Sequence, residues 1–277
     1  MRAWGLVLWL FPAVVFGRAY TTPASTPEDK LAYYVNLYRS AGTSGKQSDD
    51  FVAFVEKLEQ KQSTFKHTSD FLEFIFNKTH QKFLKSFSEY ASFPEMLDKG
   101  RYNCLTGTAL YALLLDHFDI RYQIIETNYH IFLLAQSDNG PILFETTDPA
   151  RGFVTNEKEI KNRIAAYRQN SIQATGSSKT YYRYNFDLYK VVNLDEVLGL
   201  LHYNLAIVAF NAKDLTLTID YLGKAMELYQ SPRIEEFSRI VLLTIMEGNL
   251  DPSEKEKYLE DIRSLRNKRL VVTASRN

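Results

Sequence analysis

The hydrophobic pattern changes period near the middle of the chain, and this change limits the folds available to it. The stretch Gly100–Phe118 is apolar nearly all round a helix, which is typical of a helix buried on every side. The segments 120–127, 129–136 and 141–147 are short and rich in Ile, Tyr, Phe, Leu and Thr. A turn signal, Ser137-Asp138-Asn139-Gly140, separates the last two segments. The pattern therefore predicts a buried helix that leads into an antiparallel sheet.

Helical patterns flank this segment on its N-terminal side. Thr26-Pro27-Glu28-Asp29 has an N-cap, a first-turn proline and two acids, which predicts a helix to about Ser40. Apolar residues repeat at helical spacing over 51–58 and 71–76, and a further helix is expected over 80–90. A polar helix over 157–169, a loop over 170–180 and a strand over 181–192 follow the predicted sheet. The expected fold class is therefore α+β, with N-terminal helices before the buried helix and its sheet.

The last third of the chain is expected to be helical and repeat-like. Asn193 followed by Glu196 resembles a capping box, and it predicts a helix to about residue 210. Ala206 and Ala225 have the spacing of the small residues in a tetratricopeptide repeat, which places one repeat at about 199–232. A generic helical hairpin is the alternative. About three repeats are usually needed for independent stability, so the segment 193–277 is expected to dock against the rest.

The first residues predict export. Arg2 precedes an apolar run from Trp4 to Gly17, and the small residues Gly17 and Ala19 suit a cleavage site, so we interpret residues 1–19 as a signal peptide. The run is shorter than the roughly 20 apolar residues that span a bilayer. We therefore expect a periplasmic or secreted protein with no transmembrane span in the mature chain.

Composition argues against several classes of function. The chain has 33 Lys and Arg against 33 Asp and Glu, so it lacks the basic excess of a nucleic-acid-binding protein. Cys104 is the only cysteine, which excludes an intramolecular disulfide and a Cys-rich zinc site. Four scattered histidines show no metal-ligand spacing: His67, His80, His117 and His202. No metal and no cofactor is predicted.

Cys104, His130 and a nearby acid form the candidate catalytic set. Cys104 falls in the first turn of the buried helix, where the partial positive charge of the helix favours a thiolate. His130 lies on a predicted strand, and Glu145 and Asp148 lie on or just past the next one. A histidine so placed can take the thiol proton while an acid fixes the imidazole tautomer. The alternatives for Cys104 are a buried structural thiol and a bond to another chain.

Three segments resemble the core of the transglutaminase-like superfamily: GRYNCLTGTALYALLLDHFDI, NYHIFLLAQ and GPILFETTDPARGF. The resemblance covers about residues 95–155 and implies a papain-like catalytic core with Cys104 and His130 in its first two elements. Gly107 and Ala109 match the small residues that follow the cysteine. For the acid, the spacing from His130 favours Glu145, which we prefer. Asp148 is the alternative, because Asp148-Pro149 reproduces the Asp-Pro dipeptide of the family.

The resemblance implies a domain order as well as an activity. A transglutaminase-like domain with N-terminal helices is expected over 20–192, and a tetratricopeptide-like segment over 193–277 is similar to that of the SirB1-like group. The implied activity is thiol-dependent acyl transfer on an amide of a peptide or protein, of the hydrolase/peptidase or the transamidase type. The amide of Cys104 could stabilise the oxyanion, with Tyr102, Asn103 and Tyr129 as further cleft candidates.

A binding module is the rival interpretation from another class. In that case the cleft is catalytically inactive, and the cleft and the C-terminal helices hold a peptide or a protein partner. Large side chains could then fill the space around the thiol, and Phe132, Tyr102 and Tyr129 are close enough in sequence to do so.

Overall fold

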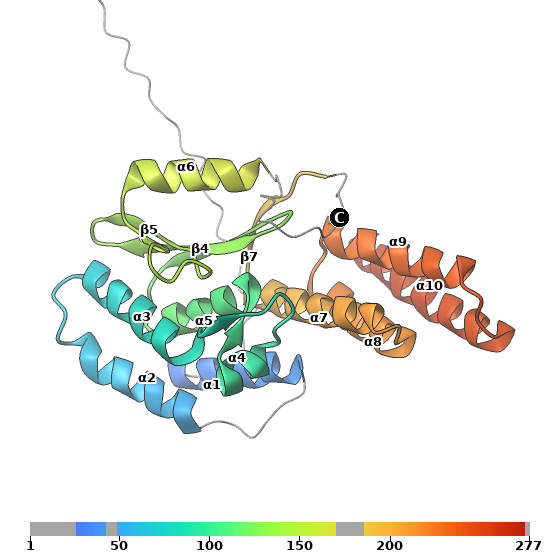
Figure 1. The fold of residues 1–277 in the computed structure, drawn as a ribbon, viewed down its shortest axis with the longest axis horizontal. Helices are drawn as coiled ribbons and strands as arrows, with labels where there is room; N and C mark the ends of the chain where they lie inside the picture. The colour runs from blue at the N-terminus through green and yellow to red at the C-terminus, as the bar shows by residue number, and fades with distance from the viewer. Residues whose placement is uncertain (1–25, 43–48, 170–185, 275–277) are drawn as a thin grey trace, which may run out of the picture.

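One buried helix, α5 (Cys104–His117), lies against a sheet at the centre of the molecule (Figure 1). The computed structural model describes residues 26–42, 49–169 and 186–274, which form a mixture of helices and sheet. The predicted signal peptide and the predicted loop 170–180 lie outside the described residues. The predicted buried helix is confirmed, because nearly every residue from Thr106 to His117 is buried.

Within the part of the chain that the structure describes, the sheet has five strands in the order β6-β5-β4-β3-β7, and every neighbouring pair is antiparallel. The strands are β3 (Tyr122–Thr127), β4 (Ile131–Ser137), β5 (Gly140–Phe144), β6 (Phe153–Val154) and β7 (Tyr189–Val192). The predicted hairpin is confirmed: Ser137 pairs with Gly140 across a two-residue turn, and Gly140 has a φ of 111°. Glycine adopts such a positive φ without steric cost.

The two faces of the sheet bury different sets of side chains, because residues along a strand alternate between faces. Ile131, Leu133 and Ala135 of β4 join the main core, while Phe132 packs with α6 (Glu157–Arg168). Figure 1 shows α6 on one side of the sheet and α5 on the other. The sheet is therefore covered on both faces at the end where β4 begins.

The N-terminal helices include two, α1 and α4, that contact α5, and they carry one correction to the sequence prediction. They are α1 (Pro27–Ser40), α2 (Asp49–Gln62), α3 (Thr68–Phe83) and α4 (Phe93–Lys99). The helix expected over 80–90 is wrong, because α3 ends at Phe83 and β1 (Ser86–Phe87) pairs in parallel with β2 (Arg101–Tyr102). The N–H groups of Lys85 and Ser86 both donate to the carbonyl of Gly100, at 2.9 and 3.0 Å, instead of to a helical turn.

As far as residue 274, where the description ends, the C-terminal segment consists of the helices α7 (Leu194–Asn211), α8 (Leu215–Leu228), α9 (Pro232–Glu247) and α10 (Pro252–Ala274). Asn193 and Glu196 form the expected capping box, and Ala206 and Ala225 are fully buried. The segment contacts the rest of the protein, since α7 packs on α5 and Tyr38 of α1 donates a 2.7 Å hydrogen bond to the carbonyl of Leu194. Among the described helices, none is long and apolar enough to cross a membrane.

Candidate active site

Cys104 is the first residue of α5, and a capping box fixes the start of that helix. The Asn103 side chain accepts a hydrogen bond from the Thr106 amide at 2.9 Å, and the Thr106 hydroxyl accepts one from the Asn103 amide at 3.0 Å. Cys104 is partly exposed. An amide in the first helical turn has no partner within the helix, so the N–H of Cys104 can serve a ligand.

His130 precedes β4 and bridges Cys104 to Glu145. Its Nε2 lies 2.5 Å from Oε2 of Glu145, and Cys104 and His130 line the same pocket. The Cys104 side chain is close enough to the ring to contribute to the pKa of His130. Burial alone would lower the pKa of His130, but the Glu145 charge and the contacts with Cys104 outweigh it and raise the pKa to about 10. The imidazole is therefore protonated at neutral pH.

Glu145 follows β5, and its carboxylate is only 6% exposed. Both the amide and the hydroxyl of Thr147 donate to Oε1, at 3.1 and 2.6 Å, and the Tyr167 hydroxyl donates to Oε2 at 2.8 Å. Burial would raise the pKa of Glu145, but the His130 charge and these hydrogen bonds lower it to about 2. The carboxylate thus stays ionised and holds one tautomer and one orientation of the imidazole.

Close backbone contacts fix the turn that carries Glu145. Gly107 of α5 lies so near this turn that an added Cβ would be 3.0 Å from the Thr146 side chain. Gly152 has even less room, because a Cβ there would collide with the backbone oxygens of Glu145 and Asp148. From α3, the ring of His80 places Nε2 3.0 Å from the carbonyl of Thr146. Contacts from α5 and α3, together with the tight approach of Gly152 within the turn, therefore position this carboxylate.

Aromatic rings cover His130 on the α6 side of the sheet. The Tyr167 ring centroid is 4.8 Å from that of His130, and the Phe132 ring stacks at 6.1 Å with an interplanar angle of 21°. Phe132 is fully buried. These rings exclude water from the ion pair on this side, and they leave the other side of the imidazole for the thiol.

A pocket of about 120 Å³ lies beside Cys104. The part of the chain before residue 193 contributes one part of its wall, and the C-terminal helices contribute the other. From the former the lining residues are Glu89, Asn103, Cys104, Leu105, Glu126, Tyr129, His130 and Ile131; from α7 and α9 they are Leu200, Tyr203, Asn204 and Arg233. The candidate nucleophile therefore faces a cavity built at the junction of the two parts of the chain.

The structure brings Cys104, His130 and Glu145 together and places the alternative acid elsewhere. Asp148 accepts a 3.0 Å hydrogen bond from the Arg151 amide and lies 3.8 Å from Arg163 of α6. Of the cleft candidates, Tyr129 lines the pocket. Tyr102 is 4% exposed and is not part of the pocket lining.

Asn103 lines the pocket, but its side chain has structural partners. Its amide nitrogen donates to the carbonyls of Glu89 and Ala91, at 2.9 and 3.2 Å, and its oxygen caps α5. This leaves the backbone amide of Cys104 as the better placed oxyanion donor among the expected groups.

Sequence reasoning missed four residues that support the site: His80, Thr147, Tyr167 and Arg233. Tyr167 lies on α6, a helix whose polar composition indicates a surface position. Arg233 lies on α9, more than a hundred residues from the turn that it contacts. The register of the β4–β5 hairpin could have indicated which acid faces His130, whereas no local pattern marks Arg233.

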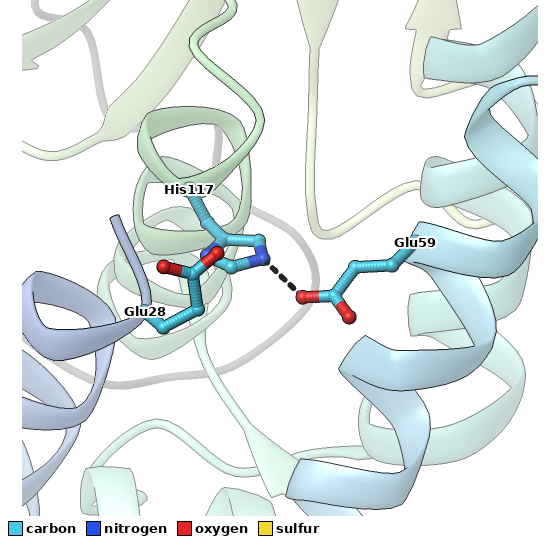
Figure 2. A group of neighbouring side chains, drawn as sticks. All are labelled: Glu28, Glu59 and His117. Carbon is cyan, nitrogen blue, oxygen red and sulfur yellow. Dashed lines mark hydrogen bonds and ion pairs between the residues drawn. The ribbon is translucent and has the colours of Figure 1, made fainter. Parts of the chain in front are cut away.

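A second group of titratable side chains lies at the other end of α5. Figure 2 shows Glu28 of α1, Glu59 of α2 and His117, each of which offers one ligand atom within 4.8 Å of the others. His117 Nε2 is 2.7 Å from Glu59 Oε1, and the histidine side chain is 3% exposed. One imidazole and two carboxylates are donors that a divalent ion such as Zn²⁺ accepts. The hydrogen bond between His117 and Glu59 accounts for the contact without an ion, and the absence of a metal stays a prediction.

Comparisons with known proteins do not assign this chain to a family. No family model, no curated protein and no solved structure matches it. The functional assignment therefore depends on the geometry of Cys104, His130 and Glu145 and on the pocket beside them.

Proposed function

We propose that the protein is a thiol-dependent acyl-transfer enzyme that acts on an amide of a peptide or protein. The observation that carries this proposal is the position of His130, which lies beside Cys104 on the wall of one pocket and 2.5 Å from Glu145. A thiol at a helix N-terminus, an imidazole and a buried carboxylate in this order are the parts of a cysteine nucleophile with its base and its orienting acid. The transglutaminase-like resemblance of residues 95–155 agrees with this arrangement.

The geometry supports a two-step reaction. The Cys104 sulfur attacks the amide carbonyl carbon, and the tetrahedral oxyanion is stabilised by the Cys104 amide at the start of α5. The C–N bond then breaks as the His130 imidazolium donates its proton to the leaving amine, which leaves a thioester and a neutral imidazole. In the second step His130 removes a proton from water or from an acceptor amine, which attacks the thioester and releases the thiol. Water gives hydrolysis, and an amine gives transamidation.

Thiol labelling tests the proposal. Iodoacetamide should alkylate Cys104 readily at pH 6 to 7, where an ordinary cysteine, with a pKa of about 8.5, is at most a few per cent ionised. In His130→Ala this reactivity at low pH should disappear, while circular dichroism shows that the variant remains folded. A rate that rises only above about pH 8 in the wild type would refute the proposal.

A bulky thiol reagent separates the proposal from a binding module. A peptide substrate must reach the sulfur, so a large maleimide should label Cys104 in the folded protein, and prior alkylation by iodoacetamide should block this labelling. Labelling by iodoacetamide together with full protection from the large reagent would favour an inactive cleft. The function would then depend on the C-terminal helices, where Leu217, Leu243 and Met246 expose apolar side chains.

A further inference from the structure

The turn that carries His130 is short, buried and held from several sides. The Thr127 amide donates to the His130 carbonyl at 2.8 Å, and the His130 amide donates to the Thr127 hydroxyl at 3.1 Å. Thr127 and Asn128 are 1% and 3% exposed. The side-chain oxygen of Asn128 accepts a 2.7 Å hydrogen bond from the amide of Leu188, just before β7. The position of the imidazole therefore depends on the position of this turn.

The C-terminal segment reaches this turn through one arginine. Arg233, in the first turn of α9, donates to the carbonyl oxygens of Thr127 and Asn128, at 2.5 and 2.8 Å. Its Nε lies 3.0 Å from Oε1 of Glu126, the residue that precedes the turn. Both carbonyl bonds come from one guanidinium nitrogen, Nη2, while Nε forms an ion pair with the carboxylate, so one side chain holds two carbonyls and a carboxylate at once.

The partner of Arg233 is itself buried and shared with a second residue of the same segment. Glu126 has a side chain only 2% exposed, and the Tyr229 hydroxyl at the end of α8 donates to its Oε2 at 2.5 Å. Burial raises the pKa of Glu126, and the charge of Arg233 opposes this rise. A buried charge of this kind needs its partner, so the contact between Glu126 and Arg233 fixes the C-terminal helices against β3.

We infer that Arg233 is a positioning residue for His130, and that the C-terminal helices complete the active site through it. This inference rests on the proposed function, because the position of His130 matters for chemistry only if His130 acts on Cys104. Arg233 binds the carbonyl oxygens of two consecutive residues, Thr127 and Asn128, and Asn128 is two residues before the catalytic imidazole. It also lines the pocket beside Cys104, so the same side chain links the pocket wall to the turn.

The test compares variants of Arg233 by the pH profile of Cys104 alkylation, with thermal unfolding measured in parallel. Arg233→Met alone would leave Glu126 buried without its counter-ion, so it is combined with Glu126→Gln. Arg233→Lys keeps a positive charge for Glu126 but loses the planar arrangement of donors. Arg239→Met is the matched control, because Arg239 lies on the same helix with a side chain 55% exposed. His130→Ala supplies the profile expected when the imidazole is absent.

We expect the double variant to unfold within a few degrees of the wild type and to move toward the His130→Ala profile. The alkylation rate at pH 6 should fall by roughly tenfold to a hundredfold, the effect that a displacement of about 1 Å has on a catalytic group. Arg233→Lys should recover part of this loss, and Arg239→Met should match the wild type. Iodoacetamide needs no binding pocket, so a change in its profile reports on the thiol and imidazole and not on substrate binding.

Two results overturn the inference, and they are distinguishable. If the folded double variant, or Arg233→Lys where the double variant does not fold, keeps the wild-type profile, Arg233 has no positioning role and the proposed function stands. If the wild type and His130→Ala have the same profile, the proposed function fails and the inference fails with it.

Discussion

Replacing Glu145 with glutamine should best distinguish a Cys104 that belongs to a catalytic triad from a Cys104 that is only structural. Glutamine keeps the size of the side chain but removes the charge that lies 2.5 Å from His130 Nε2. It also places an NH₂ group where an oxygen now accepts hydrogen bonds from Thr147 or Tyr167. The substitution therefore acts on the protonation and on the orientation of the imidazole, and it leaves Cys104 itself unchanged.

The size of the effect follows from the distance and from the pKa of His130. At an effective dielectric constant of about 20, opposite charges 2.5 Å apart attract by about 7 kcal/mol. A pKa of about 10 for His130, compared with its ordinary value of 6.5, corresponds to about 5 kcal/mol of stabilisation of the imidazolium, which this attraction can supply. Removing the carboxylate removes that stabilisation and lowers the pKa of His130. Without the carboxylate, the imidazole at pH 6 to 7 is largely neutral and no longer favours a thiolate. An ordinary thiol is ionised to about 3% at pH 7 and about 0.3% at pH 6, so alkylation should slow by up to about 30-fold and 300-fold.

The assay is the pseudo-first-order rate of iodoacetamide alkylation, followed by intact mass from about pH 5 to about pH 9. Asp148→Asn is the matched control, since Asp148 is three residues away and contacts Arg151 and Arg163. We expect its profile to stay within about threefold of the wild type. A wild-type profile in Glu145→Gln would refute the role of Glu145, and a larger effect in Asp148→Asn would transfer that role to Asp148.

Three further predictions concern the surroundings of the triad. Tyr167→Phe removes one hydrogen bond to the buried carboxylate, worth about 1.5–3 kcal/mol, but keeps the ring against His130, so alkylation at pH 6 should slow severalfold, less than in Glu145→Gln. Gly152→Ala should lower the unfolding temperature by several degrees or prevent folding, because its Cβ collides with the backbone oxygen of Glu145; unchanged thermal unfolding would contradict the close contact. The raised pKa of His130 and the lowered pKa of Glu145 predict that the ion pair stabilises the fold fully between about pH 4.5 and 6.5. This contribution should decline as pH rises toward about 10 and as pH falls toward about 2. Denaturant unfolding of the wild type and Glu145→Gln checks this, and a stability difference that grows above pH 7 would be inconsistent with the pair.

The local pattern of hydrophobic residues and turn residues was sufficient to predict the helix and the hairpin that carry Cys104, His130 and Glu145. The helix from Cys104 and the hairpin from Ile131 to Phe144 follow from hydrophobic period and from one turn, which are properties of neighbouring residues. The same hairpin explains which acid faces the histidine. Leu133 pairs with Phe144, so Glu145, the next residue, comes opposite Phe132 and close to His130, whereas Asp148 lies beyond the strand, in a turn. The pairing register of the predicted hairpin, in addition to the spacing from His130, therefore indicated Glu145 as the acid.

The supporting residues could not be predicted, because their roles depend on tertiary contacts. Arg233 lies in a helix start of ordinary composition, and only the tertiary structure brings its side chain to the carbonyls of Thr127 and Asn128. The helix expected over 80–90 failed for a related reason. Its backbone donors find partners at Gly100 and Tyr102, which are distant in sequence, and a two-strand pairing replaces the helical turn.

The arrangement of aromatic side chains bears on the choice between an enzyme and a binding module. Phe132, one of the three rings that could have filled the cleft, is buried beneath His130 on the α6 side, and Tyr102 is buried outside the pocket lining. A cavity of about 120 Å³ therefore remains beside the thiol. At about 30 Å³ for one water molecule, this volume suits a short polar group such as a carboxamide. A buried ion pair contributes little net stability compared with an apolar replacement, so a module that only bound peptides would gain little from keeping Glu145 and His130 in contact. The retention of this pair next to an accessible cavity favours the enzyme.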